Sequence, residues 1–211
     1  MPYISADERP ALDKKVGALA DELSSTLARG ENKETEISVI YKDVLVAIGR
    51  ALLELERGKA VKAPGHAKNL AVEIFKSAGN RESRGAWLGR LNYSLTRLIQ
   101  EVPAKMVEKG VWKDEFRYWL YALTVGALAR AAMEVNGSEG DGWPIDGVVG
   151  VLVDVKDEYK RRVNTAYEMV QIRKAGDCYT TPYHTELGEV KDSSGKVVGY
   201  TEVMKDFRKR Y

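Results

Sequence analysis

The 211-residue sequence contains one cysteine, Cys178, and two histidines, His66 and His184. A single cysteine cannot form a disulfide within the chain, so nothing in the sequence requires an oxidising compartment. A zinc or other transition-metal site needs several nitrogen or sulfur ligands, which these three distant side chains do not supply. We therefore expect no metal site.

Long apolar runs and an excess of one charge are also missing. The longest apolar stretch, residues 118–129, is bounded by Arg117 and Arg130, well short of the roughly 20 residues that span a membrane. Residues 1–9 are polar and lack the apolar core of a secretion signal. The net charge of +2 and the hydrophobic fraction of 44% exclude intrinsic disorder as the default state. These features predict a soluble cytoplasmic protein without a membrane contact.

Phosphate-binding loops are absent as well. The sequence has neither GxxxxGK[ST] nor a GxGxxG after a predicted strand. The glycine-rich residues 137–142 precede a predicted helix, but their two carboxylates would repel an anion, and they only half resemble a calcium loop. Cys178 would need a positioned base to act as a nucleophile. We expect no cofactor and favour a protein that is not an enzyme.

Helical periodicity is the strongest signal that is present. Apolar residues recur at steps of three and four, and these stripes predict helices near residues 10–29, 37–57, 70–76, 87–102, 113–135 and 146–170. Ser5 and Glu8 have capping-box spacing ahead of the first helix. Residues 59–69 are predicted to form a basic loop, and Pro103 to interrupt the fourth helix.

The pattern changes after Gly176. Residues 187–191 and 196–203 flank the turn sequence Asp-Ser-Ser-Gly of residues 192–195, which predicts a β-hairpin. The predicted fold is mainly all-α, a bundle of about five to six helices with a small C-terminal hairpin. We assign residues 1–179 to the helical domain and residues 180–211 to the hairpin and a basic tail.

Carboxylates on the last helix offer one catalytic alternative. Asp154 and Glu158 lie one turn apart with Asp157 between them, a spacing that suits magnesium ligands in an all-α nucleotide hydrolase. However, Asp157 with Arg161 and Glu158 with Arg162 also have the spacing of ordinary surface ion pairs. The ordered ExxE and ExxD pair of such hydrolases is missing, so we favour the ion pairs.

Basic residues offer a second alternative. The last seven residues carry four cations and one acid, a local charge of +3, so the rest of the chain sums to −1 (2 − 3). Arg208, Lys209 and Arg210, together with residues 76–90, would suit a nucleic-acid-binding accessory protein. The nearly neutral body and the lack of a known nucleic-acid-binding motif favour a solvated tail instead.

Lys156 and Arg162 stand at the two margins of the apolar stripe of the last helix. Their stems can cover the core while their charges reach solvent, or they can pair with a carboxylate such as Glu158. We favour this structural role.

Three blocks of the sequence resemble one family. They are Met-Pro-Tyr-Ile at residues 1–4, Gly-Arg-Leu-Asn-Tyr at 89–93, and a C-terminal signature formed by Lys156, Glu158, Arg161, Arg162, Tyr167, Glu168, Gly176, Asp177 and Tyr179. These blocks resemble small, uncharacterised helical proteins of bacteria and tailed phages. The resemblance implies a compact helical protein of prokaryotic or phage origin, which makes the virion a second location.

The chain departs from the family pattern at Arg90, Val153 and Ala175, where the family has an acidic residue, Glu and Asn. Residues 28–85 look like an insertion. The family supplies no reaction, so we take the polar residues of the motifs and the tail as candidate binding residues: Asn92, Tyr93, Lys156, Arg161, Arg162, Arg208, Lys209 and Arg210.

Our leading hypothesis is a non-enzymatic interaction or assembly module that forms a homo-oligomer or docks on a protein partner. Four tryptophans, eleven tyrosines and a central helix with a wide apolar stripe give more apolar surface than one small bundle hides. The hairpin could complete a sheet across a subunit interface. Nucleic-acid binding and magnesium-dependent nucleotide hydrolysis are the alternatives.

Overall fold

The computed structural model describes residues 4–29, 34–76, 87–110, 116–137, 145–164 and 185–204. The chain divides into two compact units, Met1–Thr165 and Ala166–Tyr211. We describe each unit by itself.

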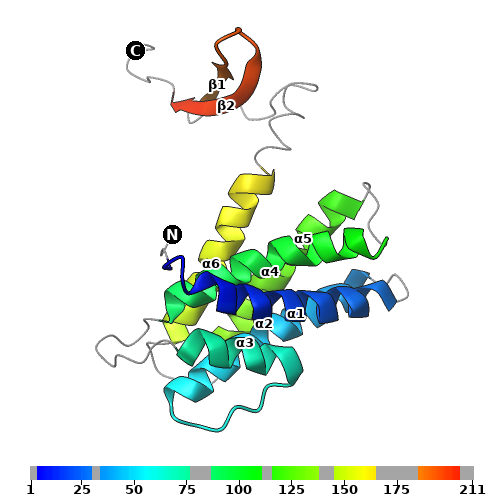
Figure 1. Ribbon diagram of the computed structural model, residues 1–211, viewed down its shortest axis with the longest axis vertical. Coiled ribbons are helices and arrows are strands. Elements are labelled where there is room, and N and C mark those ends of the chain that lie inside the picture. Colours follow the sequence, from blue (N-terminus) through cyan, green and yellow to red (C-terminus); the bar gives the residue numbers. More distant parts are fainter. Residues whose placement is uncertain are drawn as a thin grey trace. The chain divides into compact units, whose positions relative to one another are not determined.

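The first unit is helical, as predicted. Its helices are α1 (Arg9–Arg29), α2 (Glu34–Glu56), α3 (Gly65–Lys76), α4 (Leu88–Glu108), α5 (Phe116–Asn136) and α6 (Ile145–Tyr159), and a π-helical turn, η1 (Lys160–Asn164), follows α6 (Figure 1). The main helix contacts form a closed ring in the order α1, α4, α6, α5, α2, α3 and back to α1. The prediction of a mainly α fold with about five to six helices is confirmed, since the described residues form six.

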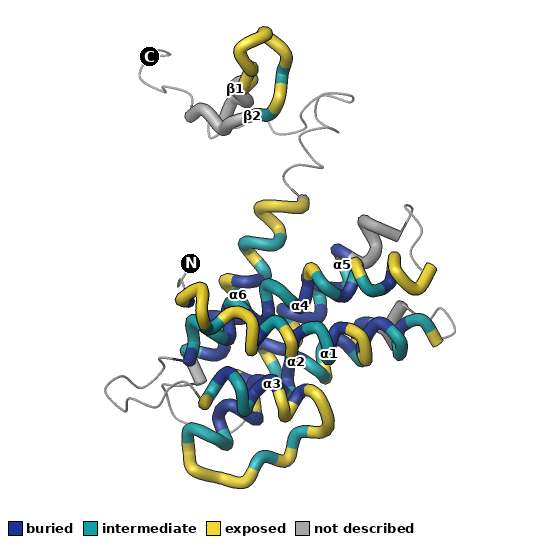
Figure 2. The backbone as a smooth tube through the Cα atoms, viewed as in Figure 1, coloured by how far each residue is buried: buried dark blue, intermediate teal, exposed yellow. Residues whose placement is uncertain are grey.

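The core fills the centre of this ring (Figure 2). Its largest fully buried side chains come from α1, α2, α3, α4 and the residue before α4: Trp87, Tyr41, Leu12, Leu19, Leu45, Ile48, Leu52, Leu70, Ile74, Leu91, Leu95 and Leu98. At Gly49 the backbone of α2 comes close to α5 and α6, since a Cβ atom there would lie 3.2 Å from Val148 Cγ1 and 3.4 Å from Val135 Cγ2. A larger residue at this point would push the helices apart.

Two of the predicted helix boundaries are wrong. The predicted loop of residues 59–69 is too long, because α3 begins at Gly65. Gly65 has φ of +47°, a left-handed conformation that usually marks the end of a helix but here marks the first residue of one. Pro103 does not interrupt α4, which continues to Glu108. Val102 and Met106 are buried on either side of the proline, so packing outweighs the single lost backbone hydrogen bond.

One end of each of two other predicted helices lies outside the described residues. The predicted start of the fifth helix at residue 113 lies outside the described residues. The predicted last helix follows α6 and η1 as far as Asn164, and its remaining part, residues 165–170, also lies outside them.

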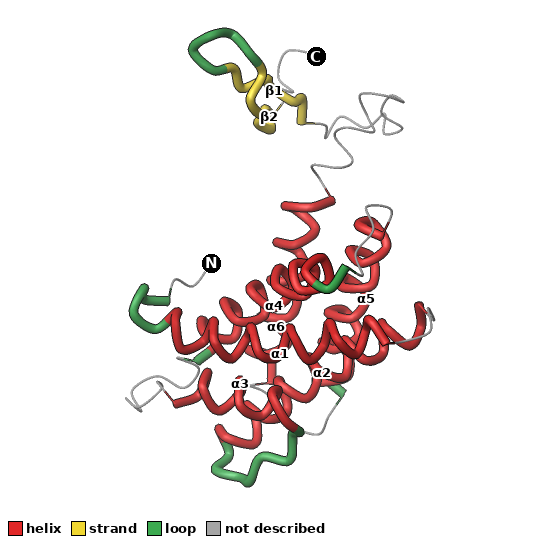
Figure 3. Tube along the Cα trace, turned by 45° about the vertical axis from the view of Figure 1, so that its right-hand side comes forward, coloured by secondary structure: helices red, strands yellow, loops and turns green. Residues whose placement is uncertain are grey.

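The described part of the second unit is a two-stranded antiparallel hairpin (Figure 3). Its strands are β1 (Thr185–Lys191) and β2 (Val197–Met204), with Thr185 opposite Met204. The Asp192 carboxylate closes the turn by accepting hydrogen bonds from the backbone N–H groups of Ser194 at 2.9 Å and Lys196 at 3.0 Å. Gly195 adopts φ of +79°, which a side chain would disfavour. The predicted hairpin is therefore confirmed.

Candidate functional site

Two polar residues of the Gly-Arg-Leu-Asn-Tyr block at 89–93, which we call the central motif, lie along the contact between α1 and α4: Arg90 and Tyr93. Tyr93 donates a hydrogen bond to Asp13 Oδ1 at 2.9 Å, and Arg97 Nε lies 3.4 Å from the same oxygen. Arg97 also pairs with Glu101 at 2.6 Å. The guanidinium of Arg9 lies 5.9 Å from the centre of the Tyr93 ring. These groups form a polar α1–α4 seam that holds the two helices in register.

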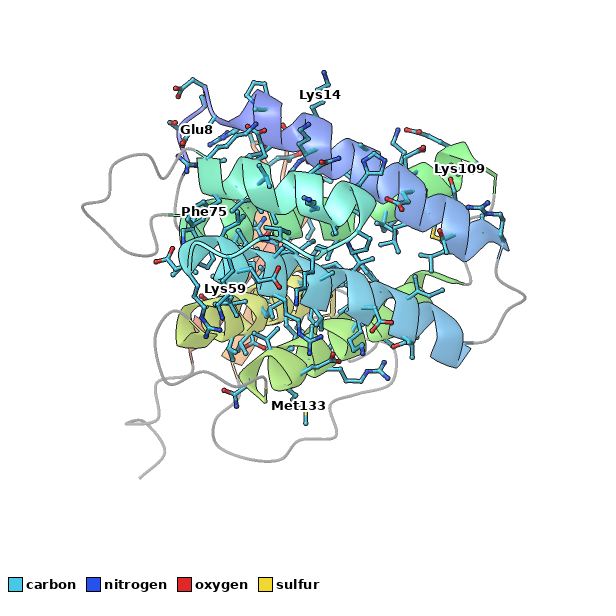
Figure 4. The ribbon with its side chains drawn as sticks, turned by 90° about the horizontal axis from the view of Figure 1, so that it is seen from below. Glu8, Lys14, Lys59, Phe75, Lys109 and Met133 are labelled. Atoms are coloured by element: carbon cyan, nitrogen blue, oxygen red, sulfur yellow. The ribbon has the colours of Figure 1, made fainter. Side chains whose placement is uncertain are left out.

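Arg90 and Glu8 close one end of the α1–α4 seam. Arg90 Nε donates to Glu8 Oε1 at 2.8 Å, and its side chain is 11% exposed. The Arg90 guanidinium holds the pKa of Glu8 below its usual value. Lys109 closes the opposite end by donating to Asp21 Oδ1 and to Ser24 Oγ, both at 2.7 Å (Figure 4). Arg90 therefore has a carboxylate partner within the helical unit, Glu8.

Stability should depend on pH through Glu8. A carboxyl whose pKa is lowered by folding stabilises the protein above its unfolded pKa, here 4.5, and loses that contribution as pH falls through the folded value. We expect Glu8→Gln to lower the free energy of unfolding by about 1 kcal/mol at pH 7, after discounting for solvent screening. The difference from the unsubstituted protein should shrink as pH falls below about 5. Urea unfolding of both proteins across this range measures it.

The matched control for Glu8 is Asp154, an exposed carboxylate on α6. Asp154→Asn should change the free energy of unfolding by less than about 0.5 kcal/mol at pH 7. A Glu8→Gln effect that stays constant as pH falls from 7 into the acid range would show that the ion pair with Arg90 does not contribute.

Asn92 and Tyr93, both candidate binding residues, have different surroundings. Asn92 is 6% exposed and therefore lies within the bundle. Tyr93 is half-buried and uses its hydroxyl within the α1–α4 seam, where burial and the bond to Asp13 raise its pKa. The geometry of both residues suits a structural role for the central motif.

The carboxylates and arginines of α6 and η1 pair with one another. Both oxygens of Glu158 accept hydrogen bonds from Arg161, at 2.8 and 2.9 Å, and Arg162 also bonds to Glu158. The two guanidinium groups lower the pKa of Glu158 to about 2. Lys156 pairs with Asp157 at 3.2 Å. Glu158 thus already has two cationic partners, an arrangement that competes with binding of a metal ion.

The remaining site candidates are a metal site and the basic residues of the C-terminal tail and of the 76–90 stretch. Within the described ranges, no group of three His, Cys, Asp or Glu side chains is placed to hold a metal ion. Arg208, Lys209 and Arg210 lie outside the described residues, as does most of the 76–90 stretch. Nucleic-acid binding by these segments stays a prediction.

The outer face of α5 is a surface that the sequence motifs did not indicate. We define it as Ala122, Val125, Gly126, Ala129 and Met133, which follow one side of the helix at steps of three and four. Ala122 and Met133 are exposed and the other three are half-buried. The Met133 side chain is 74% exposed and points away from the bundle (Figure 4). The face therefore presents an apolar stripe to solvent.

The polar groups that flank the outer face of α5 are already bonded within the chain. Glu134 pairs with Lys42 at 2.7 Å and with Arg50 at 3.2 Å, both on α2. Arg130 Nε donates to the Gly126 carbonyl at 3.3 Å, and its Nη2 bonds to the hydroxyl of Ser38. The charged residues beside the stripe thus bond α5 to α2, so they do not require a charged group from a partner protein.

Within the described residues, these observations define a six-helix bundle in the first unit and a β-hairpin in the second. Among the helices of the described ranges, none is long and apolar enough to cross a membrane. The chain belongs to the family described as a domain of unknown function (DUF6899), whose profile matches residues 1–178. No curated protein and no solved structure matches the chain. The expectation of an uncharacterised family is confirmed.

Proposed function

We propose that this protein is a non-enzymatic interaction module that self-associates, and that two copies meet through the outer face of α5. The observation that carries the proposal is the apolar stripe from Ala122 to Met133 on the solvent side of that helix. The solvent side of α1, in contrast, carries Lys14, Asp21 and Glu22. Exposed apolar stripes of this kind are typical of interaction surfaces.

A second copy of the chain is the occupant that best fits this face. The five residues carry no charge, and the flanking charges have partners within the chain. The partner must therefore present an apolar surface of similar length, which the same face of a second copy does. Ala122, Gly126 and Ala129 are small enough for two helices to approach closely. A two-fold arrangement would bury the stripe of each copy against that of the other.

One helix pair alone gives a small interface. Stable protein–protein interfaces bury about 1,200 Å² or more, and smaller ones are typical of weak, transient complexes, so we expect a dimer Kd of about micromolar order. The resemblance to proteins of bacteria and tailed phages supports a prokaryotic or phage setting for such a module. A weak, reversible dimer would suit an assembly role there.

The test of this proposal compares two glycines. A Cβ atom on Gly126 would meet only the side chain of Arg130, at 3.6 Å, and one on Gly17 of α1 would meet nothing within 4 Å. Leucine therefore fits the folded chain at either position, but at position 126 it would hold a second helix away. We expect Gly126→Leu to raise the dimer Kd at least about tenfold, equivalent to about 1.4 kcal/mol.

Gly17→Leu serves as the control because it makes the same chemical change on α1. Sedimentation equilibrium over a range of concentrations measures Kd for both variants. Equal dimer affinities for Gly126→Leu and Gly17→Leu would overturn the assignment of the interface to α5.

A further inference from the structure

A groove of about 270 Å³ lies between α1, α2 and α3. Its apolar surface includes Leu19 and Leu23 from α1 and Ile40 and Val44 from α2. The volume lies just below the range of sites for drug-sized ligands and is enough for one large side chain. The groove is therefore shaped for one apolar residue of a peptide.

The charged residues that line the groove are acidic. Glu22 of α1 and Asp43 of α2 line it together with Thr26. Asp43 pairs with Lys42 at 2.7 Å, whereas Glu22 forms no ion pair with any residue that the structure describes. An apolar floor with an unpaired carboxylate beside it favours an apolar side chain flanked by cations.

We propose that this groove receives the C-terminal segment, residues 205–211, of a second copy of the chain. This segment places the aromatic Phe207 between Lys205 and the run Arg208, Lys209 and Arg210. Its local charge of +3 complements the Glu22 carboxylate, and its phenyl ring supplies the apolar side chain. The occupant is thus chosen by charge complementarity and by the size of the groove.

The proposal goes beyond the α5 contact and uses a separate surface. The groove is formed by α1, α2 and α3, whereas the outer face of α5 lies on a helix that does not line it. In a two-fold dimer each copy would give its segment to the other, so the exchange would be reciprocal and closed. Either contact can therefore be tested while the other is left intact.

The experiment places a photoreactive diazirine analogue of phenylalanine at position 207 of the full chain. Equal amounts of ¹⁵N-labelled and unlabelled protein are mixed, irradiated, digested and analysed by mass spectrometry. We expect crosslinks to α1 and α2 residues that line the groove, in peptide pairs that combine one labelled and one unlabelled chain. Glu22→Lys should lower the yield of these pairs about threefold or more.

Asp154→Lys, the same change at an exposed carboxylate outside the groove, should leave the crosslink yield unchanged. Crosslinks within single chains only, crosslinks to other surfaces, or equal yields for Glu22→Lys and Asp154→Lys would each overturn the proposal. The molar mass of Glu22→Lys in solution is measured alongside. If the protein is a dimer but gives no groove crosslinks, the exchange of C-terminal segments is refuted and the α5 contact is not. If Glu22→Lys, which leaves Gly126 and the outer face of α5 unchanged, is a monomer, the result counts against the α5 contact as well.

Discussion

Trp87→Ala is expected to lower the free energy of unfolding by about 4 kcal/mol, the largest effect on stability that we predict. Trp87 immediately precedes α4, is 1% exposed, and is the first of the largest fully buried side chains by volume. Its Nε1 donates a hydrogen bond to Glu56 Oε2 at 2.9 Å, at the last residue of α2. Alanine would leave a cavity and also deprive the Glu56 carboxylate of its partner.

Two matched variants separate the cost of the cavity from the cost of the lost hydrogen bond to Glu56. Trp87→Phe keeps an aromatic ring but removes the N–H, and Glu56→Gln keeps an acceptor oxygen for Trp87. We expect costs of about 2 kcal/mol for Trp87→Phe and at most about 1 kcal/mol for Glu56→Gln. Chemical denaturation measures the free energy of unfolding of all three variants. A loss below about 1 kcal/mol for Trp87→Ala would contradict the position of this side chain in the core.

Met133→Glu should raise the dimer Kd about a hundredfold. Each methionine that loses its burial costs about 1.5 kcal/mol, and a two-fold dimer contains two, so the sum is about 3 kcal/mol. The side chain is 74% exposed in the single chain, so the free energy of unfolding should change by less than about 0.5 kcal/mol. A defect in association without a defect in folding is therefore the expected signature.

Val107 of α4 provides the control for Met133. It is also an exposed apolar residue, at 56%, but it lies outside the outer face of α5. Val107→Glu should leave the dimer Kd unchanged within about twofold. If Met133→Glu and Val107→Glu weaken the dimer equally, the effect comes from added charge and not from loss of a specific contact.

Much of the fold follows from local patterns in the sequence. Apolar residues at steps of three and four, and the Asp-Ser-Ser-Gly turn, predict the six helices and the hairpin because these features depend on neighbouring residues. The two wrong boundaries arise where long-range packing decides. Pro103 remains inside α4 because residues on both sides of it are buried by other helices. Sequence periodicity alone does not contain that information.

The candidate sites were less accessible to sequence reasoning. Tyr93 could be singled out because residues 89–93 resemble a family motif. Its hydrogen bond to Asp13, however, spans 80 residues of sequence and depends on how α1 packs against α4. The outer face of α5 did leave a signal. The apolar run of residues 118–129 extends around the whole helix, although α5 has neighbouring helices only along part of its surface. Without the arrangement of the helices, that run was evidence only against a membrane span.

Light scattering coupled to size-exclusion chromatography tests the central claim of self-association most directly. The measurement is made on the unsubstituted protein over a concentration series that extends well above the expected micromolar Kd. The account predicts a molar mass that rises with concentration from that of one chain, 23.5 kDa, toward twice this value. A mass that stays at 23.5 kDa at the highest concentration would contradict it.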